Sequence, residues 1–490
     1  MTTSLKLKTF ENIGYNAFAR AVAFVFQALA NIVLARNLTS DDYGVVGFAM
    51  IFITFLSQFS DLGINSAVIQ KAELDESGLY TGFAIKMVLG IFAFAISFLL
   101  ASLSKLFFDN NAVVNVIRVL SLGFILNSFA FLPTSLLTRE LNYKKLFVPQ
   151  VATAVVNSII CLTLALTGFK YWSIVLANVC ATIASVILIN ELKPVKLRFC
   201  FDRKAASELI HFGGNLFLSG IIVFAILNAD NFVIGAVKGS SLLGYYTIAF
   251  NWGSMLCAVL SNTVLSVFFP TFSKIQQDRK RIKEAYIRLL EYIAFIGVLA
   301  NAGLLFVSKE FLIFVLGHGT DKWIPALTTF RILCIYGICR CLLEPVGNVV
   351  LAIGKTKALL VTQIIVAVFE LGFLYPSLKY FGIEGVAVVV TVSYLTSYPI
   401  LFWLLKQEIG LTSMEWIKGV YPAIVSLSVS TITLYFINFA MPFSFIGMIQ
   451  KLILCSIIYF GVYGVITQWK MLYELKGIAR DIVLPRTEPS

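Results

Sequence analysis

The chain has 490 residues, of which 59% are apolar and only 13% are charged. Soluble globular proteins carry about 25% charged residues, so this composition excludes an ordinary soluble domain and predicts an integral membrane protein. The net charge of +12 would suit a nucleic-acid-binding protein, but no long soluble basic segment exists to carry it, and basic cytoplasmic loops explain the same excess. We therefore expect no nucleic acid among the partners.

The first apolar run contains a cation, Arg20. An arginine at the centre of a membrane helix costs roughly 2.5–3.5 kcal/mol on insertion scales, so we expect Arg20 to have a functional role. At about 100° per residue, Asn16, Gln27 and Asn31 fall in the same sector of the helix as Arg20. Because the run continues to Leu34, we expect an uncleaved first span rather than a signal peptide, with one polar stripe along its length.

The second apolar run carries a similar polar stripe, in which Gln58 and Asp61 lie within an arc of roughly 100°. The two spans are antiparallel, so Arg20 and Asp61 both fall in the cytoplasmic half and could form a structural ion pair. Two full polar stripes exceed what one ion pair needs, and they indicate a hydrated cavity.

About fourteen apolar runs are long enough to span a membrane, which takes roughly 20 residues each. With the N-terminus inside, the inside segments carry about 25 of the 38 lysine and arginine residues. This bias and the even number of runs predict that both termini are cytoplasmic. The runs lie near residues 12–35, 44–67, 80–104, 112–137, 147–168, 171–190, 211–237, 243–270, 287–307, 325–351, 358–379, 384–405, 418–440 and 445–467.

A weak internal repeat relates the segment 31–49 to the segment 231–249, in which an Asn, a Ser and a Gly hold equivalent positions. Since six spans separate the copies, both enter the membrane in the same direction, as in two-lobed transporters. We expect an all-α membrane protein with two pseudo-symmetric six-helix lobes and two C-terminal helices. The predicted divisions are 1–205 for spans one to six, 206–410 for spans seven to twelve, and 411–490 for two additional spans and a cytoplasmic tail.

Further charged residues within the runs are candidates for the cavity. Lys86 could instead snorkel to the cytoplasmic surface, and Arg340 and Glu344 could neutralise each other. Guanidinium groups bind phosphate through paired hydrogen bonds, so the cations predict an anionic substrate. The candidate cations are Arg20, Lys86, Arg118, Arg331 and Arg340. The polar and acidic candidates, which could also hold a coupling H⁺ or Na⁺, are Asn16, Gln27, Asn31, Gln58, Asp61, Asp230, Glu344 and Glu370.

The cysteines and histidines predict no metal site. Eight cysteines lie mostly in or beside apolar runs without metal-like spacing, and there are only two histidines. No Gly-rich Lys-Ser/Thr loop for ATP is present in the sequence. We expect no cofactor and no catalytic residues.

Several motifs together resemble a known family. They begin with Leu34-Ala-Arg-Asn-Leu-Thr-Ser-Asp-Asp-Tyr-Gly44, Asp61-Leu-Gly63 and Ala67-Val-Ile-Gln70, and continue with Phe269-Pro-Thr-Phe-Ser-Lys274 and Leu351-Ala-Ile-Gly-Lys355. In this order and spacing they resemble bacterial polysaccharide flippases of the O-antigen and colanic-acid type. These flippases belong to the multidrug/oligosaccharidyl-lipid/polysaccharide exporter superfamily.

The resemblance implies two lobes around a central cavity in the bacterial cytoplasmic (inner) membrane. It implies translocation, by alternating access, of an oligosaccharide linked to undecaprenyl pyrophosphate, for exopolysaccharide or lipopolysaccharide biosynthesis. Related flippases line the cavity with arginines, one of them in the first span, where Arg20 occupies the matching place. The implied partners are the lipid-linked oligosaccharide, membrane lipid and polysaccharide polymerase or assembly proteins.

Two other functions stay open. An ion-coupled multidrug or small-solute antiporter of the same superfamily would be expected to have an acidic site and usually twelve spans. A membrane-embedded glycan polymerase or ligase would be expected to carry a long periplasmic loop with catalytic residues. The longest outer connection, near 308–324, is short, so we expect a transporter rather than an enzyme.

Overall fold

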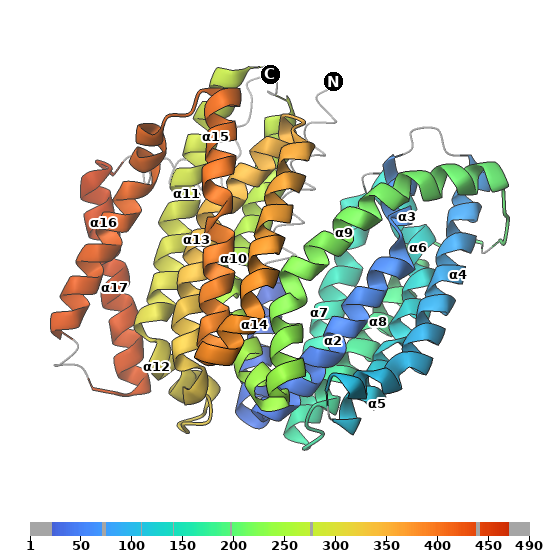
Figure 1. Ribbon diagram of the computed structural model, residues 1–490, viewed down its shortest axis with the longest axis horizontal. Coiled ribbons are helices and arrows are strands. Elements are labelled where there is room, and N and C mark those ends of the chain that lie inside the picture. Colours follow the sequence, from blue (N-terminus) through green and yellow to red (C-terminus); the bar gives the residue numbers. More distant parts are fainter. Residues whose placement is uncertain are drawn as a thin grey trace, which may run out of the picture. The chain divides into compact units, whose positions relative to one another are not determined.

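The computed structural model describes residues 22–70, 75–108, 110–140, 142–196, 198–274, 278–437 and 442–469. Every regular element in these ranges is a helix, which confirms the predicted all-α class (Figure 1). A helix at Val22–Asn37 comes first. The following α-helices are α2 (Ser40–Asp61), α3 (Ile64–Gln70), α4 (Glu76–Leu100), α5 (Asn111–Leu120), α6 (Leu122–Arg139), α7 (Tyr143–Leu166), α8 (Trp172–Leu192), α9 (Arg203–Lys238), α10 (Ser240–Lys274), α11 (Arg279–Phe306), α12 (Ser308–Glu310), α13 (Leu327–Ala352), α14 (Thr356–Leu395), α15 (Ser397–Ile409), α16 (Ser413–Ile437) and α17 (Phe445–Ile466).

Within the described ranges, 11 helical stretches are long and apolar enough to cross a membrane. Each of them overlaps a predicted span. The stretch Lys357–Ile409 has 53 residues, more than twice the roughly 20 that one crossing needs. Gly382 breaks its helical geometry with φ +67° and ψ −156°, between the two spans predicted at 358–379 and 384–405. The total of fourteen spans stays a prediction.

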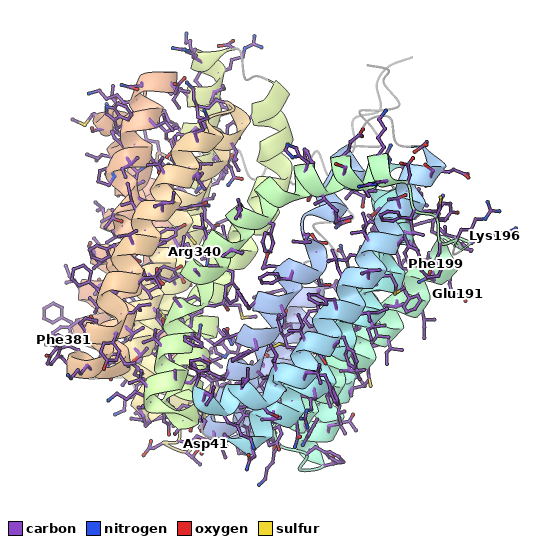
Figure 2. All side chains as sticks on the ribbon, turned by 45° about the vertical axis from the view of Figure 1, so that its right-hand side comes forward. Asp41, Glu191, Lys196, Phe199, Arg340 and Phe381 are labelled. Carbon is purple, nitrogen blue, oxygen red and sulfur yellow. The ribbon has the colours of Figure 1, made fainter. Side chains whose placement is uncertain are left out.

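Large apolar side chains cover much of the outside of the helices. Leu99, Val368 and Ile457 are 72%, 66% and 62% exposed. Phe381, beside the break at Gly382, projects away from the ribbon (Figure 2). A soluble protein rarely exposes so much apolar surface, whereas lipid chains cover it favourably. The chain is therefore a multi-pass membrane protein.

The chain forms two compact units. Unit 1 comprises Met1–Asn251, Leu316–His318 and Leu360–Ser397, and unit 2 comprises Trp252–Val315, Gly319–Leu359 and Tyr398–Ser490. In unit 1, α2 packs against α4, α5 and α9, and α6 packs against α4 and α8. In unit 2, α11 packs against α13 and α16, and α16 packs against α17. The lobe boundaries at 1–205, 206–410 and 411–490 rest on span counting and stay a prediction.

The two copies of the internal repeat meet in unit 1, where the first turns of α2 and α10 touch. A Cβ added at Gly44 would lie 1.9 Å from the Ser240 carbonyl oxygen, and one added at Gly244 would lie 1.8 Å from the Ser40 carbonyl oxygen. Ser240 Oγ also donates to Asp41 Oδ1 at 2.6 Å. The glycine of each copy thus contacts the serine of the other copy. Such reciprocal contacts are produced by a two-fold axis between the copies. We call this contact, formed by residues 40–44 and 240–244, the repeat contact.

The first turn of α2 is held in place by its own side chains. Thr39 caps the helix, since its hydroxyl accepts from the Asp42 backbone N–H while the Asp42 carboxylate accepts from the Thr39 N–H at 2.9 Å. Such a reciprocal capping box fixes where a helix begins. It therefore sets the position of Asp41 and Gly44 in the repeat contact.

Candidate functional site

A polar cavity of about 410 Å³ lies inside unit 1, between α2, α4, α6 and α8. These helices belong to stretches long enough to cross a membrane. Polar groups in such surroundings are costly unless they contact water, a ligand or one another, so a cavity of this kind indicates a hydrated or substrate-filled space. The lining residues are Met50, Ile53, Ser57, Gln58, Ser60, Asp61, Lys86, Leu120, Gly123, Phe124, Asn127, Asn178 and Thr182.

The two charged residues of the cavity wall form an ion pair. Lys86 Nζ lies 2.7 Å from Asp61 Oδ1 and also donates to the Ser60 carbonyl oxygen at 3.0 Å. The Lys86 side chain is 12% exposed and that of Asp61 is 41% exposed. Lys86 therefore does not snorkel to the membrane surface, because Asp61 and the end of α2 provide acceptors inside the unit.

The backbone around Asp61 explains why a cation is needed there. Helix α2 stops at Asp61, because Leu62 and Gly63 take positive φ values of +41° and +68° before α3 begins. A carboxylate in the last turn of a helix is unfavourable beside the negative end of the helix dipole. Lys86 compensates both the carboxylate and the Ser60 carbonyl oxygen. The Asp61-Leu-Gly63 motif thus builds one corner of the cavity.

The first-span candidates lie only partly within the described ranges. Arg20 and Asn16 are outside them, so the predicted Arg20–Asp61 pair stays a prediction; Asp61 pairs with Lys86. Gln27 is exposed and Asn31 is half-buried in the helix Val22–Asn37. Neither of these two side chains lines the cavity described above.

Gln58 does line the cavity, on the side where α9 approaches α2. A Cβ added at Gly220 would lie 2.7 Å from Gln58 Oε1, so the missing side chain of Gly220 makes room for the amide. Asn127 from α6 and Asn178 from α8 also line the cavity, although the sequence interpretation passed over them. It followed charged residues, whereas the available signal was an uncharged amide in the interior of each apolar run.

Arg118 lies away from this cavity. It is in the last turn of α5, where a cation interacts favourably with the helix dipole. Its guanidinium carbon lies 5.0 Å from the centroid of the Phe98 ring, and its NH2 nitrogen lies 3.4 Å from Ser102 Oγ. The structure therefore does not bring Lys86 and Arg118 into one wall.

The acidic candidates Asp230 and Glu370 are both buried in unit 1, each 2% exposed. Asp230 Oδ2 accepts from the Tyr246 hydroxyl at 2.7 Å, and Glu370 Oε2 accepts from the Ser393 hydroxyl at 3.1 Å. Glu370 Oε1 has no hydrogen-bond partner in the part of the chain that the structure describes. These enclosed carboxyl groups are candidate positions for a coupling cation or proton, a role that stays a prediction.

The candidates of α13 divide between two environments. Arg340 Nε lies 2.8 Å from Glu344 Oε1, one turn apart beside Pro345, so these two charges neutralise each other as the sequence allowed. Arg331 is separate from this pair, because its Nε donates to Ser308 Oγ at 2.8 Å. It lines another pocket, which belongs to unit 2.

Comparison with known proteins supports the fold and the family. The chain matches the family described as polysaccharide biosynthesis protein over residues 33–328, more than half of its length. It is 24% identical over 434 residues to the lipopolysaccharide biosynthesis protein WzxC of Escherichia coli K12, with 85% of each chain covered.

Two solved structures share the fold. One is the lipid II flippase MurJ in an inward closed conformation, with a TM-score of 0.73 and 14% identity over 95% of this chain and 99% of that chain. The other is an inward-facing multidrug resistance MATE family transporter of the MOP superfamily, with a TM-score of 0.66 and 15% identity over 80% of this chain and 98% of that chain. At these identities the likeness shows that this chain has the fold of that superfamily.

Proposed function

We propose, from the premise that this chain belongs to the polysaccharide biosynthesis protein family, that it is a flippase for a lipid-linked oligosaccharide. It translocates the repeat unit of a surface polysaccharide, carried on undecaprenyl pyrophosphate, from the inner to the outer leaflet. It acts in the bacterial inner membrane, with both termini in the cytoplasm. The names of its relatives support this proposal, since one is a lipopolysaccharide biosynthesis protein and a structural neighbour is a lipid II flippase.

The observation that carries the proposal is the polar cavity of unit 1. Its walls are membrane-spanning helices, yet they present hydroxyl, amide and charged groups to a common space. Hydroxyl and amide groups are suitable partners for sugar hydroxyls, because each can donate and accept hydrogen bonds. A helix bundle with a purely structural role would not be expected to keep a cavity of this size lined by Gln58, Asn127 and Asn178, because buried polar groups are costly in a membrane.

We assign the pyrophosphate to cations on the first-lobe helices. Arg20 is the main candidate, and Lys86, whose charge Asp61 balances in this structure, contributes an ammonium to the substrate when that pair opens. Arg118, which lies away from this cavity, is a contact for a later, outer stage of the cycle. Guanidinium groups hold phosphate oxygens in pairs, which makes arginine the better anchor.

Coupling ions and partners complete the proposal. The buried carboxyl groups of Asp230 and Glu370 are positioned to exchange H⁺ or Na⁺ during the cycle, and no organic cofactor takes part. Membrane lipid surrounds the helices, and a polysaccharide polymerase or other assembly protein receives the translocated unit. The protein itself carries out transport and no covalent chemistry.

The repeat contact provides the conformational element for alternating access. By the predicted orientation, residues 40–44 and 240–244 lie at the outer ends of α2 and α10. We propose that this contact is closed when the substrate site faces the cytoplasm and opens when the site faces outward.

The rival functions receive less support. The MATE-like fold alone would fit a multidrug antiporter, but the family match favours polysaccharide transport. A glycan polymerase or ligase would need a catalytic group in a large outer domain. In the described ranges, the outer connection between α11 and α13 consists of short helical turns.

Arg20→Ala is expected to abolish restoration of surface polysaccharide in cells that lack their own flippase, because it removes the main pyrophosphate contact. Arg20→Lys should restore only a small fraction, since lysine keeps the charge but loses the paired hydrogen bonds. The measurement is surface polysaccharide together with accumulated lipid-linked intermediate. Full restoration by Arg20→Ala at normal protein abundance would contradict the assigned role, and drug resistance without polysaccharide would favour the antiporter.

A further inference from the structure

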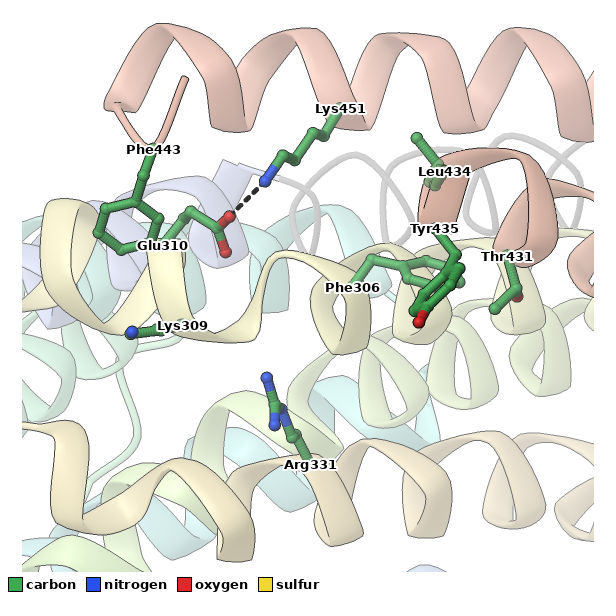
Figure 3. Close-up of a pocket in the computed structure, with 9 residues that line it drawn as sticks. All are labelled: Phe306, Lys309, Glu310, Arg331, Thr431, Leu434, Tyr435, Phe443 and Lys451. Atoms are coloured by element: carbon green, nitrogen blue, oxygen red, sulfur yellow. Dashed lines mark hydrogen bonds and ion pairs between the residues drawn. The ribbon is translucent and has the colours of Figure 1, made fainter. Parts of the chain in front are cut away.

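A second pocket, of about 420 Å³, lies in unit 2 among α11, α12, α13, α16 and α17 (Figure 3). Three cations line it, namely Lys309, Arg331 and Lys451, together with one carboxylate, Glu310. By the predicted orientation all of these residues lie at the outer ends of their helices. The pocket is separate from the polar cavity of unit 1, and the proposed transport cycle does not use it.

Two of the four charges cancel. Lys451 Nζ lies 2.6 Å from Glu310 Oε1, and the two side chains are only 10% and 8% exposed. A buried pair of this kind holds α17 against α12 and contributes no net charge. The pocket is therefore left with the charges of Lys309 and Arg331, which are both exposed.

The remaining two cations are held in place without being neutralised. Arg331 is fixed through Nε by the hydroxyl of Ser308, and its guanidinium is directed from α13 toward the segment that carries Lys309 (Figure 3). Its two terminal nitrogens have no hydrogen-bond partner among the described residues. Lys309 Nζ lies 5.2 Å from the centroid of the Phe443 ring, a contact that positions an ammonium group but leaves its charge.

Apolar side chains form the rest of the pocket wall and reach the outside of the molecule. Tyr435 and Phe443 line it and are 67% and 51% exposed. Tyr435 lies in the last turn of α16 and Phe443 lies just before α17, and both helices have further exposed apolar residues that suit lipid. A ligand that fits must therefore combine an anionic head with an apolar chain.

We propose that this pocket binds the phosphate head of a lipid in the outer leaflet, with Arg331 and Lys309 as its anionic-head ligands and Tyr435 and Phe443 against its apolar part. Phosphate oxygens accept paired hydrogen bonds from a guanidinium and a further bond from an ammonium. The lipid is either an anionic phospholipid of the bilayer or a polyprenyl pyrophosphate, which share this chemistry. Basic pockets between membrane helices are a recurring form of lipid headgroup site.

The test is equilibrium lipid binding to purified full-length protein, measured by native mass spectrometry without any transport step. The lipids are phosphatidylglycerol, undecaprenyl pyrophosphate and a neutral glucosyl diacylglycerol. Arg331→Gln and Lys309→Gln should each weaken binding of phosphatidylglycerol, and of any undecaprenyl pyrophosphate bound in addition to that at the first-lobe site, by about tenfold, as expected for loss of one charged hydrogen bond. The double variant should weaken it by about a hundredfold.

The matched control is Lys322→Gln, which removes a cation from the same outer connection but outside the pocket, where its ammonium lies over Trp323. It should bind phosphate lipids as the wild type does. A larger loss of phosphatidylglycerol binding in the double variant would assign a bilayer lipid. A larger loss of undecaprenyl pyrophosphate binding, beyond what the first-lobe cations retain, would assign the carrier lipid; either loss supports the site. Wild-type binding by the correctly folded double variant, or equal binding of the neutral glycolipid, would overturn it. Because Lys309 is exposed, its single variant keeps the test valid if the Arg331 variant does not fold.

Discussion

Gly44→Ala and Gly244→Ala are each expected to abolish polysaccharide export, although each adds only one methyl group. The added Cβ would lie 1.9 Å or 1.8 Å from the carbonyl oxygen of the opposite serine, so the repeat contact cannot close without moving two helix backbones apart. Backbone cannot rotate away as a flexible side chain can. The measurement is surface polysaccharide in cells lacking their own flippase, with protein abundance in the membrane followed in parallel.

Gly44 and Gly244 hold equivalent positions in the repeat contact. Since both glycines serve one contact, the double variant should lower protein abundance in the membrane no further than either single variant, as expected for coupled positions. Gly372→Ala and Gly461→Ala are matched controls within helices, because a Cβ at either position meets nothing within 4 Å. Normal export by Gly44→Ala at normal abundance would contradict a closing role for the contact.

A reversible disulfide distinguishes the role of the repeat contact in transport from its contribution to folding. Ser40 Oγ and Ser241 Oγ lie 3.1 Å apart, on α2 and α10. In the variant Ser40→Cys/Ser241→Cys the two sulfur atoms are close enough to form a disulfide with little movement. Oxidation should therefore stop export and reduction should restore it. Export that continues at the wild-type rate in the oxidised, cross-linked protein would show that the contact never opens.

Asp61→Asn is expected to lower stability and to stop export, because it leaves the nearly enclosed Lys86 ammonium without its counter-ion. Breaking a buried pair costs roughly 3–5 kcal/mol, and we expect about 2–3 kcal/mol here because water in the cavity reaches Asp61. Lys86→Met should cost less, since the more exposed Asp61 carboxylate can be hydrated. The measurement is the thermal unfolding midpoint of the purified protein.

The double variant Asp61→Asn/Lys86→Met distinguishes structure from function. Removing both charges should return most of the stability, because no unpaired ion remains. Export should stay lost, because the substrate cavity then lacks the Lys86 ammonium. Recovery of export would show that the pair only joins α2 to α4. Glu140→Gln is the matched control: it breaks the Lys193–Glu140 pair, whose side chains are 31% and 46% exposed, and should cost at most about 1 kcal/mol.

The membrane spans could be predicted from the sequence because a bilayer imposes one length and one composition on every crossing. The break at Gly382 lies between two apolar runs, where a residue without a side chain tolerates positive φ. Helical periodicity also placed Gln58 and Asp61 on one face of α2, and both line the cavity. These features depend on local sequence alone.

Partners between helices could not be predicted in the same way. Periodicity states which residues share a face of one helix, but it does not state which helix that face meets. Asp61 pairs with Lys86, which the sequence alone left free to snorkel, and Glu310 pairs with Lys451 across 141 residues of chain. The motif from Leu34 to Gly44 indicated the family, whereas the structure shows its physical role: capping of α2 and close approach to α10.

The most direct test of the account is translocation by the purified protein in proteoliposomes that contain an undecaprenyl-pyrophosphate-linked oligosaccharide. We expect the protein to transfer this lipid between leaflets, measured as the fraction accessible to a glycosidase added outside. We also expect oxidised Ser40→Cys/Ser241→Cys to be inactive until reduced. Equal accessibility with wild-type protein, with the oxidised variant and with empty vesicles would contradict the proposal that this chain is a flippase.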